Sequence, residues 1–233
     1  MSVPDGDITV PTVVRDLAGP DDIEPVWSNE LGGLTFRLGT GRYVKWTPVA
    51  ASIDLEEERR RLQWVIRYSP VPEVLDTGSD DSGSWMVTEA LPWGNAVADR
   101  WKTDPAVAVR GAATGLRAFH DAVPVAQCPF DWSVISRIGD RDLPVEPPPI
   151  DRLVVCHGDA CMPNTLITDD GSWAAHVDMG TMGVADRWAD LAPAIWSTEY
   201  NFGRDYCAAF LDAYGIDLDS ERLAYYLWLW EST

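Results

Sequence analysis

The sequence predicts an α+β protein of two lobes, a small sheet-rich lobe followed by a mostly helical one. Residues of alternating polarity form a hairpin pattern within the first fifty positions. Helical periodicity dominates after residue 104, and the proline- and glycine-containing run 90–95 interrupts both patterns. A length of 233 residues suits two such lobes. We therefore expect a first lobe at residues 1–89, a hinge at 90–95 and a second lobe at 96–233.

In the first lobe, strands and turns surround one predicted helix. Leu34–Leu38 and Arg42–Trp46 alternate in polarity on either side of a glycine-rich turn, which indicates a hairpin. Leu55–Tyr68 places its apolar residues near one helical face, with Asp54 as the expected N-cap. Trp85–Thr88 is a short apolar strand that leads into the hinge.

In the second lobe, a long helix is expected to begin at Asp104 as N-cap and Pro105 at the first helical position. Leu153–Cys156 indicates a buried strand, and Thr165–Val177 a second hairpin. The chain after Asp186 is predicted to be helical, with two glycine breaks.

The charge is strongly negative. Thirty-seven acidic and 18 basic residues give a formal net charge of −19, which argues against a nucleic-acid partner because phosphate backbones would be repelled. Such a surface would attract a cationic small molecule and raise its association rate by roughly 10- to 1,000-fold at low salt. The same charge is also explained by solubility alone.

Cysteine usage and the chain's beginning both predict a cytoplasmic protein. The four cysteines show neither a paired CxxC spacing nor a zinc-ligand spacing, so a reducing compartment is expected. The first residues have no basic region followed by an apolar core, as a signal peptide would. No apolar stretch approaches the roughly 18 residues of a membrane-spanning helix, so no membrane association is expected.

The most informative stretch is residues 157–164, which read H-G-D-x-x-x-x-N and are followed by D-M-G at 178–180. Phosphoryl transfer in a kinase-type site uses a carboxylate beside the attacking hydroxyl, an amide oxygen five residues on, and a second carboxylate. Asp159, Asn164 and Asp178 have this spacing. Hard oxygen ligands of this kind suit Mg²⁺. The alternative is a tight turn stabilised by Asp159 and Asn164, but a turn does not account for the second carboxylate.

A kinase-type site also needs a cation for the nucleotide phosphates, held by a carboxylate on a helix. Lys45 lies on a predicted strand, and Glu58 lies one helical turn from the inward-facing Leu55 and Leu62. The alternatives are a solvated strand lysine and a surface ion pair between Glu58 and Arg61. The adjacent glycines 32 and 33 would fit either a small phosphate-binding nest or a plain turn, because the full G-x-G-x-x-G pattern is lacking.

Simple structural roles are expected for the three histidines. His157 would brace the loop that contains Asp159, and His120 ends an apolar helix stripe as a core residue. His176 has no partner at metal-ligand spacing. Three tryptophans near the end of the chain suit either stacking on a sugar ring or core packing: Trp196, Trp228 and Trp230.

From about residue 26 to its end, the chain resembles the aminoglycoside phosphotransferases, and among them the kanamycin/neomycin 3′-phosphotransferase type. The most specific blocks are Cys128–Asp131, Val155–Asn164 and Val177–Ala192. The resemblance implies a protein-kinase-like fold and transfer of the ATP γ-phosphoryl group to an antibiotic hydroxyl. ATP would be the co-substrate, Mg²⁺ the metal and a cationic small molecule the acceptor.

The resemblance also implies a role for each matching residue. Asp159 resembles the catalytic aspartate, and Asn164 and Asp178 resemble the metal ligands. Lys45 and Glu58 look like the phosphate-binding pair, and Asp190 looks like a buried support of the catalytic loop. The remaining implied contacts are Gly32 and Gly33 for phosphates, Thr88, Glu89 and Ala90 for adenine, and Glu199 and Glu231 for the acceptor.

This chain departs from the family pattern near the acceptor. Thr181 stands where many relatives have an arginine, and about twenty residues separate Asp131 from Leu153, where resistance enzymes have a longer acidic segment. The leading hypothesis is therefore an ATP- and Mg²⁺-dependent phosphotransferase acting on an aminoglycoside or a related amino-sugar. The alternatives are a housekeeping kinase of another hydroxyl-bearing metabolite and a nucleotide-binding pseudoenzyme.

Overall fold

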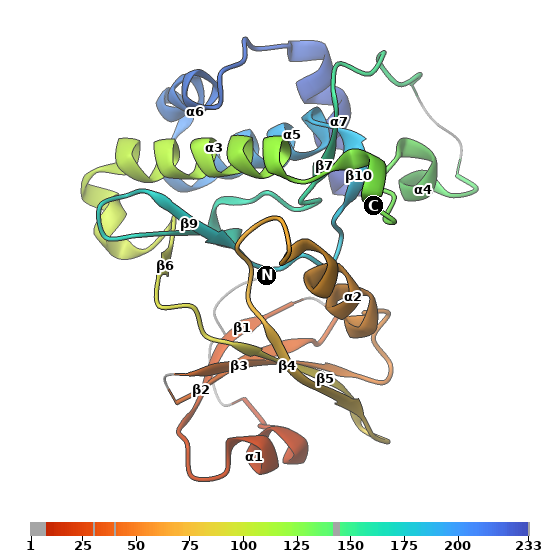
Figure 1. The fold of residues 1–233 in the computed structure, drawn as a ribbon, viewed down its shortest axis with the longest axis vertical. Helices are drawn as coiled ribbons and strands as arrows, with labels where there is room; N and C mark the ends of the chain where they lie inside the picture. Colours follow the sequence, from red (N-terminus) through yellow and green to blue (C-terminus); the bar gives the residue numbers. More distant parts are fainter. Residues whose placement is uncertain (1–7, 30, 40, 142–144, 233) are drawn as a thin grey trace. The chain divides into compact units, whose positions relative to one another are not determined.

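The computed structural model describes residues 8–29, 31–39, 41–141 and 145–232 (Figure 1). The chain forms two compact units. Unit 1 comprises residues 1–66 and 72–92, and unit 2 comprises 67–71 and 93–233. The last junction falls within residues 90–95, whose role as a hinge stays a prediction.

The described residues of unit 1 form a five-stranded antiparallel sheet in the order β1-β2-β3-β5-β4, together with two helices. Its elements are α1 Thr12–Ala18, β1 Ile23–Ser28, β2 Leu34–Leu38, β3 Arg42–Pro48, α2 Leu55–Val65, β4 Val74–Ser79 and β5 Gly83–Glu89. The hairpin β2–β3 and strand β5 confirm the sequence prediction. The expectation of one helix was wrong, because α1 also forms, and α2 ends three residues earlier than expected.

The two faces of this sheet have different partners. Val14 and Ala18 of α1 pack in one apolar cluster with Phe36 and Val44, which pair across β2 and β3. Successive side chains of a strand point to opposite faces, so Lys45 lies on the face opposite α1. Asp54 caps α2 as predicted, because its side chain accepts hydrogen bonds from the N–H groups of Glu56 and Glu57.

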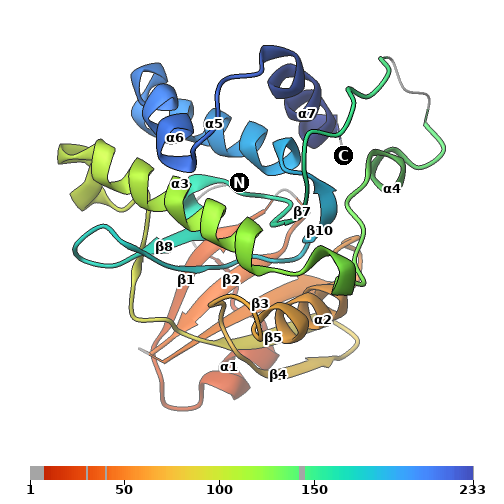
Figure 2. The same cartoon turned by 45° about the horizontal axis from the view of Figure 1, so that its top comes forward.

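Unit 2 is mostly helical (Figure 2), and its described strands form a two-stranded sheet, β10-β7, and a three-stranded sheet, β6-β8-β9. Its helices are α3 Pro105–Ala122, α4 Val134–Ile138, α5 Trp188–Phe202, α6 Cys207–Tyr214 and α7 Ser220–Ser232. Its strands are β6 Gly94–Asn95, β7 Leu153–Cys156, β8 Thr165–Ile167, β9 Trp173–His176 and β10 Gly183–Asp186. Short 3₁₀ turns cover Asp99–Thr103, Val125–Gln127, Met162–Asn164 and Arg204–Tyr206.

The predicted elements of unit 2 are present, with one correction. Pro105 begins α3 as expected, but the side chain of Asp104 makes no capping hydrogen bond within the described residues. None of the described helices combines the length and apolar character that crossing a bilayer requires.

Helix α3 approaches the hairpin β8–β9 closely because of two glycines. Gly111 and Gly115 are four residues apart and therefore share one face of α3. A Cβ atom at Gly111 would collide with the carbonyl oxygen of Gly171, and one at Gly115 would collide with the indole of Trp173. The absence of two side chains thus sets the position of the hairpin.

We expect Gly115→Ala to destabilise the protein by about 1–3 kcal/mol, because the added methyl group overpacks the contact with Trp173. This loss would outweigh the gain of about 1 kcal/mol that alanine normally brings to a helix. Thr114→Ala, at the exposed neighbouring position, is the matched control. Urea unfolding measures both variants, and equal stability of Gly115→Ala and wild type would contradict the packing argument.

Candidate functional site

The predicted catalytic loop follows the buried strand β7 and is fixed at its start by Asp190 of α5. The N–H groups of His157 and Gly158 donate to the two carboxylate oxygens of Asp190, at 2.6 and 2.8 Å. His120 of α3 is 2.9 Å from the same carboxylate and 2.8 Å from the hydroxyl of Tyr214. His120 is thus a buried, hydrogen-bonded core residue, as predicted.

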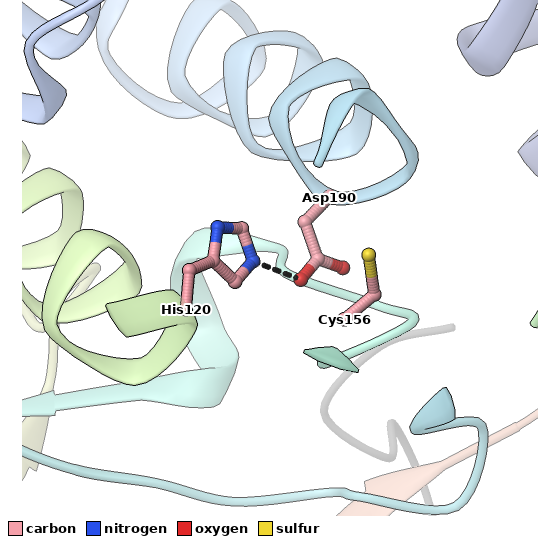
Figure 3. A group of neighbouring side chains, drawn as sticks. All are labelled: His120, Cys156 and Asp190. Carbon is pink, nitrogen blue, oxygen red and sulfur yellow. Dashed lines mark hydrogen bonds and ion pairs between the residues drawn. The ribbon is translucent and has the colours of Figure 1, made fainter. Parts of the chain in front are cut away.

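Three buried side chains each bring one potential metal-ligand atom to within 4.8 Å of the others: His120, Cys156 and Asp190 (Figure 3). Both oxygens of Asp190 already accept backbone N–H groups, and the thiol of Cys156 donates to the carbonyl oxygen of Asp186 at 3.4 Å. Burial raises the pKa of this thiol well above its usual value, which disfavours the thiolate that a metal would need. This group is therefore a hydrogen-bonded support and not a metal site.

The loop closes on itself through Asn164. Its Nδ2 donates to the backbone oxygen of Asp159 at 2.9 Å and to Oδ2 of the same residue at 3.1 Å. Oδ1 of Asp159 is buried and has no hydrogen-bond partner among the described residues. Because the amide nitrogen of Asn164 is engaged by Asp159, the amide oxygen stays available to a hydrogen-bond donor or a metal ion.

Asp178 is held beside this loop by the hairpin β8–β9. The strands begin right after Asn164 and end at His176, and their first pair is Thr165 with His176. The N–H of Val177 donates to the backbone oxygen of Asn164 at 2.9 Å. The fourteen-residue spacing between Asn164 and Asp178 is therefore the length of one closed hairpin.

His157 braces the junction of the two segments, as predicted. Its Nε2 lies 2.9 Å from the carbonyl oxygen of Val177, and its Nδ1 accepts the N–H of Asp159 at 3.3 Å. Both ring nitrogens are thus engaged by the backbone. The ring is a structural brace, and the carboxylate of Asp159 is the candidate base.

The electrostatics of the loop favour a protonated Asp159 more than water does. Burial raises the pKa of the Asp159 carboxyl, and the negative charge of Asp178 raises it further. Hydrogen bonds from the Cys161 thiol and from the amide of Asn164 act in the opposite direction. Two carboxylates close enough to repel each other favour a bound cation.

In unit 1, Lys45 and Glu58 form the predicted pair. Nζ of Lys45 on β3 is 2.6 Å from Oε1 of Glu58 on α2, and the Glu58 side chain is only 7% exposed. Glu58 is buried, so it is not the surface side chain that the alternative of a pair with Arg61 assumes. Arg61 pairs with Glu57 at 3.0 Å.

Other predicted nucleotide contacts in unit 1 have N–H groups that are already engaged. The side chain of Asn29 accepts from the N–H of Gly33 at 2.8 Å, and the backbone oxygen of Asn29 accepts from Gly32 at 3.2 Å. The turn at these glycines thus closes on Asn29. The N–H groups of Glu89 and Ala90 donate to backbone oxygens within the same unit. Thr88 lies on β5 and pairs with β3 and β4.

The predicted acceptor contacts lie on helices α5 and α7 of unit 2. Glu199 is exposed and forms an ion pair with Arg204 at 2.9 Å, whereas Glu231 is exposed near the end of α7. Trp196 stacks on Tyr200 with ring centroids 5.4 Å apart and lies 5.5 Å from Trp230. Trp196 keeps 37% of its surface exposed, so it is not a purely core residue.

His176 is a buried histidine in an apolar environment. The ring is fully buried against Phe119, Trp173 and His157, and neither nitrogen has a hydrogen-bond partner among the described residues. Burial lowers the pKa of His176 well below 6.5. The side chain is therefore neutral in the folded protein.

We expect the unfolding free energy of the metal-free protein to fall as the pH drops below about 6.5. Below this pH the unfolded chain protonates His176 while the folded chain does not, so acid favours unfolding by up to about 1.4 kcal/mol per pH unit. His176→Leu should remove this slope. Urea unfolding between pH 5 and 8 tests this, and an unchanged slope in the variant would contradict a neutral buried ring.

Known proteins resemble this chain over most of its length. Residues 137–226 match the model of the phosphotransferase enzyme family. The aminoglycoside 3′-phosphotransferase of Streptomyces fradiae is 36% identical over 224 residues, which cover 79% of this chain and 82% of that protein. The streptomycin 3″-kinase of Streptomyces griseus is 36% identical over 247 residues, covering 88% and 89%.

Solved structures extend the similarity to the fold. The aminoglycoside phosphotransferase APH(3″)-Id from Streptomyces rimosus superimposes with a TM-score of 0.75 and 28% identity, over 94% of this chain and 95% of that one. A second structure of that protein contains ADP and streptomycin. The predicted α+β, protein-kinase-like fold is thereby confirmed.

Proposed function

Because this chain belongs to the aminoglycoside phosphotransferase family, we propose that it transfers the γ-phosphoryl group of ATP to a hydroxyl group of an aminoglycoside or a related amino-sugar. The observation that supports this most directly is the assembly of Asp159, Asn164 and Asp178 by one loop and one hairpin. A pseudoenzyme would not need this arrangement.

Asp159 is proposed as the catalytic base. Its Oδ2 is fixed by Asn164, while its buried Oδ1 lacks a partner among the described residues. A substrate hydroxyl would satisfy this orphaned atom by donating its hydrogen bond to it. As the hydroxyl oxygen attacks the γ-phosphorus of ATP, its proton passes to the carboxylate, and the bond between the γ-phosphorus and the β,γ-bridging oxygen breaks to release ADP.

The same donor set fits a magnesium ion. The amide oxygen of Asn164 and the carboxylate of Asp178 are hard oxygen ligands, and Mg²⁺ typically binds one or two carboxylates plus phosphate oxygens and waters. Mg²⁺ held there would neutralise negative charge on the β- and γ-phosphates. The repulsion between Asp159 and Asp178 would be reduced by such a cation.

The nucleotide is proposed to engage Lys45 of unit 1 through its phosphates. Glu58 is nearly buried and anchors the ammonium group from α2, so the lysine has a defined position. Thr88, Glu89 and Ala90 are proposed to hold the adenine. Since the N–H groups of Glu89 and Ala90 are already bonded, their carbonyl oxygens would accept from the base.

The acceptor is proposed to be a cationic sugar. The net charge of −19 would attract its ammonium or guanidinium groups. The exposed faces of Trp196 and Tyr200 offer cation–π and stacking surfaces beside the acidic Glu199. Relatives named for the 3′ and the 3″ position are equally similar to this chain, so both neomycin and streptomycin are acceptors to test.

The proposal is tested by incubating the protein with ATP, Mg²⁺ and either neomycin or streptomycin, and detecting the phosphorylated antibiotic by mass spectrometry. Transfer to an amino alcohol or a simple amino-sugar alone would favour the housekeeping kinase. Tight nucleotide binding without transfer to any acceptor would favour the pseudoenzyme.

Asp159→Asn should lower kcat by about 10²- to 10⁴-fold, because the amide cannot accept the hydroxyl proton. The same variant should be more stable by about 1 kcal/mol at pH 7, roughly 2–4 °C in Tm, because it removes a buried charge. The free energy of unfolding of wild type falls as pH rises through the raised pKa of Asp159, because the buried carboxyl then ionises. The stability difference between the variant and wild type should therefore grow with pH. Retained activity in the variant would refute the role.

Lys45 can be tested against an internal control, because the chain contains one other lysine, the exposed Lys102. Lys45→Met should raise the KM for ATP at least tenfold, whereas Lys102→Met should leave it unchanged. An amine-reactive acyl-phosphate derivative of ATP should label Lys45 and spare Lys102. Because Lys45→Met removes a cationic partner of the buried Glu58, the double variant with Glu58→Gln separates loss of stability from loss of binding. Equal labelling of both lysines would refute the assignment.

A further inference from the structure

A buried hydroxyl on α5 faces the catalytic loop rather than its own helix. The Ser197 side chain is 2% exposed, and its Oγ accepts the backbone N–H of Met162 at 3.0 Å. Nδ2 of Asn201 also donates to it, at 3.2 Å. The adjacent Thr198 is equally buried, but its hydroxyl donates to the carbonyl oxygen of Ala194 within the helix.

The position of Ser197 on α5 is related to that of Asp190. The two residues are seven positions apart, which is close to two helical turns, so they share one face about 10 Å apart. Asp190 holds the start of the loop at His157 and Gly158, and Ser197 holds it again at Met162. The intervening residues 159–161 therefore lie between two hydrogen-bonded attachment points on one helix.

The attachment at Met162 lies next to the hydrogen bonds by which Asn164 orients the carboxylate of Asp159. Met162 begins the 3₁₀ turn that ends at Asn164, whose amide binds both the backbone oxygen and Oδ2 of Asp159. A displaced Met162 would therefore move Asn164 and the carboxylate together. The side chain of Cys161 also points to α5, with Sγ 4.0 Å from the carbonyl oxygen of Pro193.

We propose that Ser197 is a positioning residue for the phosphoryl-transfer reaction, which holds the loop from Asp159 to Asn164 in its productive geometry by accepting the N–H of Met162. The catalytic consequence rests on the proposed function of Asp159, whereas the anchoring of the loop does not. The experiment therefore has one arm that needs an acceptor and one that does not.

The first arm measures amide hydrogen exchange of the segment 157–164 by mass spectrometry. Ser197→Ala should lose protection there, because the N–H of Met162 loses its acceptor. Thr198→Val removes an equally buried hydroxyl one residue away and should leave this segment as protected as in wild type. Asn201→Ala keeps the acceptor but removes a donor to it, so it should show a smaller loss and serves if Ser197→Ala does not fold.

The second arm measures kinetics with ATP and either streptomycin or neomycin. Ser197→Ala should lower kcat by about 10- to 100-fold, because a displacement of about 1 Å near the chemistry costs up to roughly that factor. The KM for ATP should stay within twofold. Ser197→Thr, which keeps the hydroxyl, should recover most of the activity, and Thr198→Val should match wild type.

Two results would overturn the proposal. One is unchanged exchange of residues 157–164 in Ser197→Ala, and the other is a loss of activity that Thr198→Val reproduces. If wild type phosphorylates neither streptomycin nor neomycin, the proposed acceptor class fails, and the exchange arm decides the anchoring by itself. Loss of protection confined to Ser197→Ala and Asn201→Ala would then support it.

Discussion

The geometry of the candidate site depends on one buried carboxylate, that of Asp190. The residue is fully buried, and an ionised carboxylate without water is costly unless hydrogen bonds replace its hydration. Its partners are the N–H groups of His157 and Gly158 and the ring of His120. The bonds that offset the desolvation cost are the same bonds that fix the start of the catalytic loop. The loop therefore cannot move without leaving a buried carboxylate unsatisfied.

The second constraint is the hairpin β8–β9, which turns a separation along the sequence into proximity in space. Asn164 and Asp178 flank its open end, and the bond from the N–H of Val177 to the oxygen of Asn164 continues the pairing beyond the strands. Two glycines of α3 let that helix come close to the Gly171 backbone and the Trp173 indole of the hairpin. The two proposed metal ligands thus sit on a paired, packed element, which limits their relative motion.

The sequence predicts features that depend on local periodicity and misses those that depend on distant partners. Lys45 and Glu58 were predictable because strand alternation and helical spacing determine which way each points. Strand β4 has no alternating pattern and forms because β5 offers it an edge, so it was missed. Ser197 was also missed, because its partner Met162 is 35 residues away in the sequence. Its seven-residue spacing from Asp190 indicates a contact with the loop only once α5 is known to face that loop.

Around the loop, the polar atoms that support it are hydrogen-bonded, whereas an oxygen of the candidate base has no partner among the residues that the structure describes. This difference indicates where a ligand would bind. The supporting atoms of Asp190, His120 and Ser197 are fully engaged. In contrast, Oδ1 of Asp159 is buried without a described partner, and Asp178 is the only non-glycine residue in the described ranges with a positive φ, at 62°. A left-handed conformation and an orphaned oxygen each cost roughly 1–3 kcal/mol. Such costs persist where the surrounding bonds leave the chain no alternative, and here they fall on the two carboxylates that would face ligands.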